Sequence, residues 1–236
     1  MKRTPFLVSA VLAYLLIQSA FASEIQTKIQ GVFGDKSAVV SDYDKHLKKV
    51  VVNGSKVYFA THNGRYLFGG PIIDTEQRTN IVSLQENQLR QTYLNSLPED
   101  VFVSYPSNTP NKHKITVITD IDCPYCRKFH SHMKSFNQLG ISVNYVMLPR
   151  AGVGSASHAK TVAALCSDNP ADSITNAMQN ENLAPHNCEP NVMNQHMKIV
   201  RDLKIKSTPT IVLPNGQLKL GLVSPDQLLA LLKSTE

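Results

Sequence analysis

The pattern of hydrophobic and polar positions changes period along the chain and divides it into two parts. In the first part, short β-rich runs follow one another between residues 50 and 68, separated by Asn53-Gly54 and Asn63-Gly64. Asn-Gly between β-rich runs is a strong signal for a tight hairpin turn. This stretch therefore predicts a small antiparallel meander, which has few large apolar residues and can bury little surface alone.

Residues 83–98 predict a helix that connects the two parts. Ser83 and Glu86 have the spacing of a capping box, and Pro98 ends the helical pattern. The apolar positions form a narrow stripe, while glutamines occupy the opposite side. The helix is therefore expected to be a connector with a largely solvated face.

The second part alternates between strands and helices. A strand over 114–120, a helix over 124–139 and a strand over 141–148 predict a right-handed βαβ unit. A helical insertion over 155–203, a hairpin over 210–222 and a last helix follow. This order is the thioredoxin plan, and it predicts an α+β fold. We expect a small antiparallel N-terminal dimerisation domain (23–82), a linker helix (83–98) and a thioredoxin-fold catalytic domain with a helical insertion (99–236).

The first 22 residues have the features of a cleaved signal peptide. Lys2 and Arg3 precede an apolar run over 6–17, and residues 20–22, Ala-Phe-Ala, form a small-x-small cleavage site. The run is too short to span a bilayer as a helix. Without the two basic residues the net charge falls from +6 to +4, a mild excess that gives no argument for nucleic acid. An exported protein without membrane insertion is predicted.

The tetrapeptide Cys123-Pro124-Tyr125-Cys126 carries the chemistry. It joins a buried strand to a helix, and proline is favoured at the first helical position. Cys123 is expected at the exposed helix start, where the dipole favours a thiolate, with Cys126 as the buried resolving thiol. The alternatives are that the motif provides half of a zinc site or forms a permanent structural disulfide. A second ligand pair is missing, however, and permanent disulfides rarely occupy such a junction, so thiol–disulfide exchange is favoured.

Cys166 and Cys188 form a second pair inside the helical insertion. They could be redox-active or a permanent link. A disulfide closing this loop would stabilise the insertion by roughly 3–4 kcal/mol on the chain-entropy model. Neither cysteine begins a helix as Cys123 does, so we interpret the pair as structural.

For two further residues the sequence gives weaker evidence of a role in the active site. His130 follows Cys126 by one helical turn and could bind a metal or tune the thiols, although such a histidine is more often a surface residue. Arg150, directly after Pro149 at the end of a strand, could approach Cys126 and assist its deprotonation. No metal and no cofactor are predicted.

With these residues in place, the chain resembles the bacterial DsbC/DsbG family of periplasmic disulfide isomerases, and most closely its DsbC branch. The motifs that carry the resemblance are the signal peptide, Gly69-Gly70-Pro71 after the meander, the linker helix, the Cys-x-x-Cys stretch, Pro149-Arg150, the second cysteine pair and Ser207-Thr208-Pro209. One position departs from the pattern. The DsbC branch usually carries glycine where Pro124 stands, and Cys-Pro-Tyr-Cys is the DsbG form, so the reduction potential and the client preference stay open.

The resemblance implies a V-shaped homodimer whose arms face a shared cleft for misfolded or misoxidised exported proteins. It implies that Pro209 is a cis proline packed against the cysteines, that the Thr208 backbone pairs with extended clients, and that a DsbD-type membrane reductant supplies electrons. We also expect Tyr125 to contact clients. Gly70 is expected at the dimer interface, where it allows close backbone approach.

Two other functions stay open beside the isomerase. A DsbG-like holdase chaperone with a secondary reductase role would use the cleft more than the cysteines. A periplasmic metal carrier would use Cys123, Cys126 and His130. An isomerase is favoured over an oxidase, because a dimerising base and a helical spacer serve an enzyme that must hold one client through several exchanges.

Overall fold

The structure is a computed structural model that describes residues 23–110, 113–179, 181 and 191–235. The predicted signal peptide and Cys188 lie outside these residues. The chain separates into two compact units, one up to Glu86 and one from Asn87 onward. Within the described ranges, no helix is both long and apolar enough to cross a bilayer.

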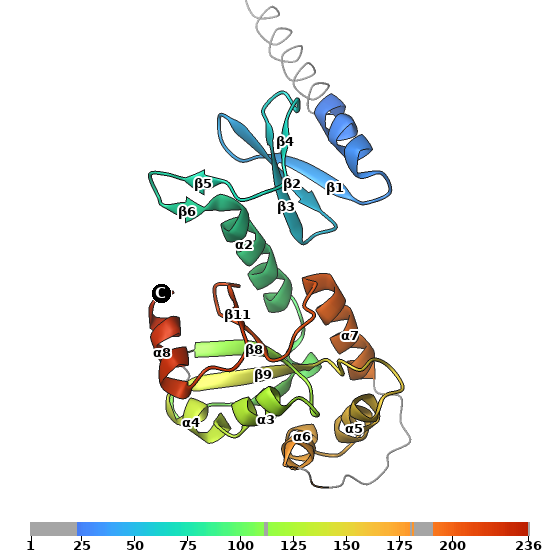
Figure 1. Cartoon of the computed structure of the whole chain (residues 1–236), viewed down its shortest axis with the longest axis vertical. Coiled ribbons are helices and arrows are strands. Elements are labelled where there is room, and N and C mark those ends of the chain that lie inside the picture. The colour runs from blue at the N-terminus through green and yellow to red at the C-terminus, as the bar shows by residue number, and fades with distance from the viewer. Residues whose placement is uncertain (1–22, 111–112, 180, 182–190, 236) are drawn as a thin grey trace, which may run out of the picture. The chain divides into compact units, whose positions relative to one another are not determined.

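The first unit is built on an antiparallel sheet with the strand order β1-β2-β3-β4 (Figure 1). The strands are β1 (Ala38–Asp42), β2 (Leu47–Val52), β3 (Lys56–Thr61) and β4 (Leu67–Phe68). A helix over residues 23–33 packs on it, and the core consists of Ile25, Ile29, Ala38, Val50, Val52 and Ala60. The predicted meander is confirmed, with β1 as an additional strand at its edge.

The turn between β2 and β3 shows why the meander was predictable. Asn53 and Gly54 both have positive φ, 50° and 68°. The loop between the paired residues Val52 and Lys56 has three residues, and asparagine and glycine are the residues that tolerate its positive φ angles best. A further small hairpin, β5 (Ile73–Asp74) with β6 (Thr79–Asn80), follows β4 and was not predicted.

Helix α2 (Ile81–Asn95) begins two residues earlier than predicted. Its first turn is capped by Asn80, whose side-chain oxygen accepts hydrogen bonds from the N–H groups of Val82 (3.1 Å) and Ser83 (3.4 Å). The predicted capping box is therefore wrong. Glu86 instead accepts from the Val57 N–H and pairs with Lys56 in the first unit.

The C-terminal half of α2 is part of the second unit and is not a solvated connector. Leu94 is buried in a core cluster, and the Tyr93 hydroxyl donates to Asp202 at 2.7 Å. Gly216 approaches the helix so closely that a Cβ atom there would lie 2.0 Å from the Asn87 carbonyl oxygen. Gln91 also donates to the Pro214 carbonyl at 2.8 Å. The turn over residues 214–216 thus holds the helix against the sheet.

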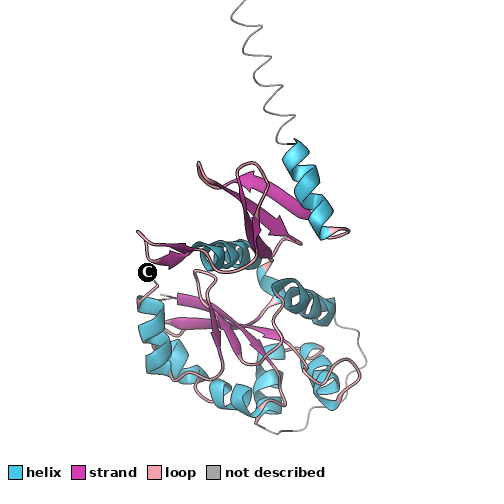
Figure 2. Ribbon diagram, turned by 45° about the horizontal axis from the view of Figure 1, so that its top comes forward, coloured by secondary structure: helices cyan, strands magenta, loops and turns pink. Residues whose placement is uncertain are grey.

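The second unit contains a five-stranded sheet with the order β11-β10-β8-β9-β7. Its strands are β7 (Val103–Tyr105), β8 (His113–Thr119), β9 (Ile141–Met147), β10 (Thr210–Val212) and β11 (Leu218–Leu220). β8 and β9 are parallel, and they lie side by side in Figures 1 and 2. The βαβ unit and the final hairpin are confirmed. β7, at the edge of the sheet, is not among the strands predicted from the sequence.

Helices cover both faces of this sheet (Figure 2). They are α3 (Pro124–His130), α4 (Met133–Gln138), α5 (Ala156–Leu165), α6 (Pro170–Met178), α7 (Asn191–Leu203) and α8 (Pro225–Lys233), with a short 3₁₀ turn η1 (Glu99–Val101) before β7. The helix predicted over 124–139 is thus broken after His130. Residues from α3, α4, α6 and α8 share one core cluster with Ile115 and Val117 of β8, whereas α7 and the end of α2 pack with Ile118 on the other face.

Candidate active site

β8 places the Cys-x-x-Cys motif at the start of α3. Cys123 is the N-cap residue of that helix, in extended conformation, and Pro124 occupies the first helical turn. The Cys123 backbone N–H donates to the Asp120 carbonyl at 3.1 Å, and the Cys123 carbonyl accepts from the Arg127 N–H at 3.0 Å. The strand-to-helix junction predicted from the sequence is confirmed, and it leaves the Cys123 sulfur at the positive end of the helix.

Both thiols are free, and both are buried, with 1% of Cys123 and none of Cys126 exposed. The expected exposure of Cys123 is wrong for this structure. Burial opposes ionisation of Cys123, but stabilisation of its thiolate by the Thr208 hydroxyl, by the Cys126 backbone N–H and thiol, and by the Arg150 charge lowers its pKa overall. Burial raises the pKa of Cys126 to about 11. Cys123 is therefore the sulfur that ionises first.

The loop before β10 faces Cys123. The Thr208–Pro209 peptide bond is cis, as predicted. The Cys123 thiol donates to the Thr208 carbonyl oxygen at 3.6 Å, and the Gly221 N–H donates to the Pro209 carbonyl at 2.9 Å. The Thr208 hydroxyl is buried and finds no hydrogen-bond partner among the described residues. It is thus available to donate to a thiolate.

A buried carboxylate, Asp120, organises the other side of the site. It is 2% exposed and accepts hydrogen bonds from Ser157, from the Asp122 N–H (3.0 Å), and from the N–H (3.0 Å) and Nε (3.2 Å) of Arg150. Burial alone would raise its pKa, but these hydrogen bonds outweigh it and lower the pKa, so the group is charged. Asp120 in turn holds the Arg150 guanidinium where its positive charge lowers the pKa of Cys123.

The hypothesis that Arg150 assists the motif is thereby refined. Among the causes of the lowered pKa of Cys123 is the Arg150 charge, whereas burial dominates at Cys126. Asp120 and Ser157 were not singled out from the sequence. The signal for Asp120 was present, since an acidic residue directly after a buried strand and three positions before the motif requires partners.

His130 is buried, and the expectation of a surface residue is wrong. Its Nδ1 lies 3.1 Å from the Tyr145 hydroxyl and its Nε2 lies 3.1 Å from Thr175 Oγ1. The Thr175 hydroxyl donates to the Ala171 carbonyl, so it accepts from His130 Nε2–H, and Nδ1 accepts from Tyr145. Burial lowers the pKa of His130 to about 4. The ring is a neutral link between α3, α6 and β9.

The remaining predicted residues are Tyr125, Cys166, Cys188 and Gly70. The Tyr125 ring is 66% exposed between the two cysteines. Cys166 is disulfide-bonded at the end of α5, but its predicted partner Cys188 lies outside the described residues, so their pairing stays a prediction. Gly70 belongs to the first unit. Across the described ranges, no group of three or more histidine, cysteine or acidic side chains is arranged to hold a metal.

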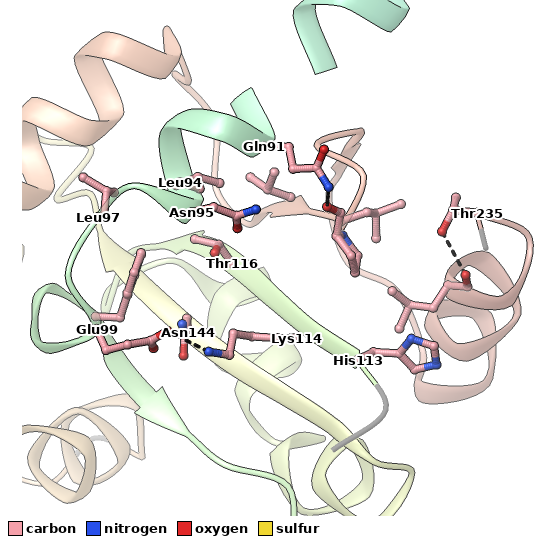
Figure 3. A pocket seen from close by; sticks show the side chains of 15 residues that line it. Gln91, Leu94, Asn95, Leu97, Glu99, His113, Lys114, Thr116, Asn144 and Thr235 are labelled. Carbon is pink, nitrogen blue, oxygen red and sulfur yellow. Dashed lines mark hydrogen bonds and ion pairs between the residues drawn. The ribbon is translucent and has the colours of Figure 1, made fainter. Parts of the chain in front are cut away.

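A pocket of about 520 Å³ lies elsewhere on the second unit (Figure 3). It is bounded by the end of α2, by β8 and β9, and by the segment after α8. Its lining includes the ion pair between Lys114 and Glu99 at 2.9 Å, and neither Cys123 nor Cys126 lines it. None of the predicted site residues lines it, so this pocket is not the site of the thiol chemistry.

A strand that delivers Cys-x-x-Cys to a helix start, opposite a cis proline, defines a thioredoxin-like thiol–disulfide oxidoreductase. The thioredoxin-like domain family matches residues 107–236, and the disulfide bond isomerase N-terminal domain matches residues 17–83. The chain belongs to the DsbC family of thiol:disulfide interchange proteins, and it is a disulfide isomerase.

Curated relatives support this assignment. The chain is 32% identical over 186 residues to thiol:disulfide interchange protein DsbC from Salmonella typhimurium, an alignment covering 78% of this chain and 76% of the relative. It is 30% identical over 213 residues to DsbC from Escherichia coli K12, covering 89% and 88%. Among solved structures, a disulfide interchange protein from Neisseria gonorrhoeae shares the fold, with a TM-score of 0.51 and 22% identity over 58% of this chain and 97% of that one.

Proposed function

We propose that this isomerase works in the periplasm as a homodimer and rearranges incorrect disulfides in exported proteins. The observation that carries the proposal is the opposite direction of the two pKa shifts, lowered at Cys123 and raised to about 11 at Cys126. The Cys123 sulfur then ionises more readily and is the nucleophile, while the Cys126 thiol stays protonated near neutral pH. This difference favours a long-lived mixed disulfide, in which the client can exchange its remaining bonds.

In the isomerase cycle the Cys123 thiolate attacks one sulfur of a wrong client disulfide. The client S–S bond breaks, a Cys123–client S–S bond forms, and the displaced client sulfur leaves as a thiolate. That thiolate, or another one on the client, attacks elsewhere until a client sulfur displaces Cys123. Cys123 leaves as a thiolate again, and no electrons are transferred overall.

A second route releases a stalled client. Cys126 loses its proton to solvent and attacks Cys123, so the mixed disulfide breaks and a Cys123–Cys126 disulfide forms. The client departs as a thiolate that takes up a proton and is reduced by two electrons, while the enzyme is oxidised by two. A dithiol reductant of the DsbD type would return the pair to the free thiols.

Client binding is assigned to Tyr125, Thr208 and Pro209. The exposed Tyr125 ring offers an apolar contact beside the motif, and exposed aromatic side chains are frequent anchors for partners. The Thr208 carbonyl lies next to the Cys123 sulfur. An extended client chain that pairs with this backbone would bring its disulfide to Cys123.

The homodimer is assigned to the N-terminal unit, whose family match is to the isomerase N-terminal domain. Export is supported by the basic start, apolar run and small-x-small site within residues 1–22. A homodimer fits an enzyme that must hold one client between two active sites.

Two cysteine variants test the proposed function. A scrambled multi-disulfide client is incubated with the enzyme, and mixed disulfides are trapped by acid and alkylation. Cys126→Ser should accumulate mixed disulfides and keep part of the rescue, whereas Cys123→Ser should show neither. The thiol state trapped from cells should be reduced. A pair found mostly oxidised, together with no rescue of the scrambled client, would indicate an oxidase and contradict the proposal.

A further inference from the structure

Thr119, the last residue of β8, lies on the face of the sheet that carries the catalytic helix. Along a strand, alternate side chains share one face. Ile115 and Val117 belong to the core cluster that contains Phe129 of α3, whereas Ile118 belongs to the cluster on the opposite face. Thr119 continues the first series, so its side chain points toward α3 and the buried Cys126.

The Thr119 hydroxyl is unusual because it is buried without a partner. The residue has no exposed surface, and Oγ1 has no hydrogen-bond partner among the described residues. Buried hydroxyls are nearly always paired, because an unpaired one loses its hydrogen bonds to water without replacement. Valine has almost the same shape and would fill the position without that cost. Packing alone therefore does not account for threonine here.

The ionised Cys126 sulfur would be a hydrogen-bond acceptor for the Thr119 hydroxyl. The Thr119 hydroxyl and the Asp120 backbone N–H both favour the ionised form of the Cys126 sulfur, as does the Thr208 hydroxyl. The Thr208 hydroxyl is likewise buried without a partner. Two unpaired hydroxyls next to a thiol that is hard to ionise form a set of donors prepared for a negative charge.

We propose that the Thr119 hydroxyl donates a hydrogen bond to the Cys126 sulfur during resolution of the mixed disulfide. In that step Cys126 loses its proton to solvent and its thiolate attacks the Cys123 sulfur. The Cys123–client bond breaks as the Cys123–Cys126 bond forms, and the client sulfur leaves and is protonated. The negative charge that Thr119 stabilises exists only between deprotonation and attack, and this accounts for a hydroxyl that has no partner beside the free thiols.

Thr119 thereby sets how long a client stays attached. Stronger stabilisation of the Cys126 thiolate speeds release as a reductase would, and weaker stabilisation leaves more time for rearrangement. The inference rests on the proposed function only in that Cys126 is the resolving thiol.

The test is a single-turnover release experiment on the full-length protein. Cys123 is converted to a mixed disulfide with glutathione, excess reagent is removed, and the release of glutathione is followed as a function of pH. The variants are Thr119→Val, which removes the hydroxyl, and Thr119→Ser, which keeps it. Thr116→Val is the matched control, since it makes the same change on the opposite face of β8. Thr119→Ala serves if the valine variant does not fold.

Thr119→Val should slow release by about tenfold at neutral pH and raise the apparent pKa of release by about one unit, because a hydrogen bond to an anion contributes on this order. Thr119→Ser should restore most of the rate, and Thr116→Val should stay within about twofold of the wild type. The attack of Cys123 on oxidised glutathione should be unchanged. The other ionisable groups that act on Cys126 or are acted on by it, Cys123, Tyr145 and Arg150, stay in place in every variant.

Release from Thr119→Val at the wild-type rate and pH profile would overturn the inference. Equal slowing of attack and release, not restored by serine, would also overturn it, because a role in packing alone predicts that result. If wild-type release does not depend on Cys126, the proposed function fails. If it does depend on Cys126 but not on the Thr119 hydroxyl, only this inference fails.

Discussion

His196, at the centre of α7, should make the catalytic unit sensitive to acid. The ring is fully buried; its Nδ1 accepts from the Met147 N–H at 3.2 Å and its Nε2–H donates to the Val101 carbonyl at 2.6 Å. Both bonds require the neutral ring, because a second proton on Nδ1 would face an N–H donor. Burial accordingly lowers the pKa from 6.5 to about 4.

The sign and size of the effect follow from linkage between proton binding and folding. Between about pH 6.5 and about pH 4 the unfolded chain binds a proton at His196 that the folded chain does not, so the free energy of unfolding falls as the pH drops. At about 1.4 kcal/mol per pKa unit, the loss reaches about 3 kcal/mol below pH 4 and is about 2 kcal/mol at pH 5. His130, with its pKa lowered to about 4, should add a loss in the same direction.

The perturbation is His196→Gln, because glutamine offers one acceptor and one donor but does not titrate. Urea unfolding is followed by far-ultraviolet circular dichroism at neutral pH and at about pH 5, since the chain has no tryptophan. The variant should lose about 2 kcal/mol less than the wild type on acidification. His158→Gln, at a partly exposed position on α5, is the control. An unchanged acid sensitivity in His196→Gln would refute the reasoning.

Three further outcomes are expected. Asp120→Asn should raise the pKa of Cys123 by about one unit, because the asparagine no longer anchors the Arg150 guanidinium by its charge; titration of thiolate absorbance measures this, and an unchanged pKa would contradict the network. Gly216→Ala should destabilise the catalytic unit by at least ~2 kcal/mol, because the added Cβ would collide with the Asn87 carbonyl and residue 216 has a φ of +81°. Thermal unfolding measures the change. An unchanged midpoint would refute the tight contact. Gly70→Leu should leave the fold intact, because a Cβ at this position has no atom of the same chain within 4 Å. The same variant should weaken the homodimer, which sedimentation measures. An unchanged dimer would place the interface elsewhere.

The sequence predicted those parts of the fold that are encoded locally. The β2–β3 turn needs only Asn53 and Gly54, and α8 needs only Ser224 and its capping partner Gln227, which form a capping box. The start of α3 was predictable for the same reason, because Pro124 suits the first helical turn wherever the helix packs. In each case the residues that determine the structure are within four positions of one another.

The parts that were missed depend on contacts between distant residues. His130 is buried because Tyr145 and Thr175, 15 and 45 positions away, close over it. Asp120 can stay charged only because Arg150 and Ser157 reach it from 30 and 37 positions further along. Periodicity along one helix or strand contains no information about such partners. The site was therefore predictable as a pair of cysteines but not as the surroundings that make the two cysteines different.

The division of α2 between the two units has a consequence for protein engineering and for recombination among related enzymes. Residues 87–95 look like connector, yet the turn around Gly216 and the core around Leu94 need them. A catalytic unit transplanted from Pro98 onward would lose the cover over Ile118 and Val146 of its own sheet. One transplanted from Asn87 would keep it. The segment that can be transplanted intact thus includes about two and a half turns of α2 in addition to the thioredoxin fold. A recombination point that keeps the contacts of each unit falls between Glu86 and Asn87.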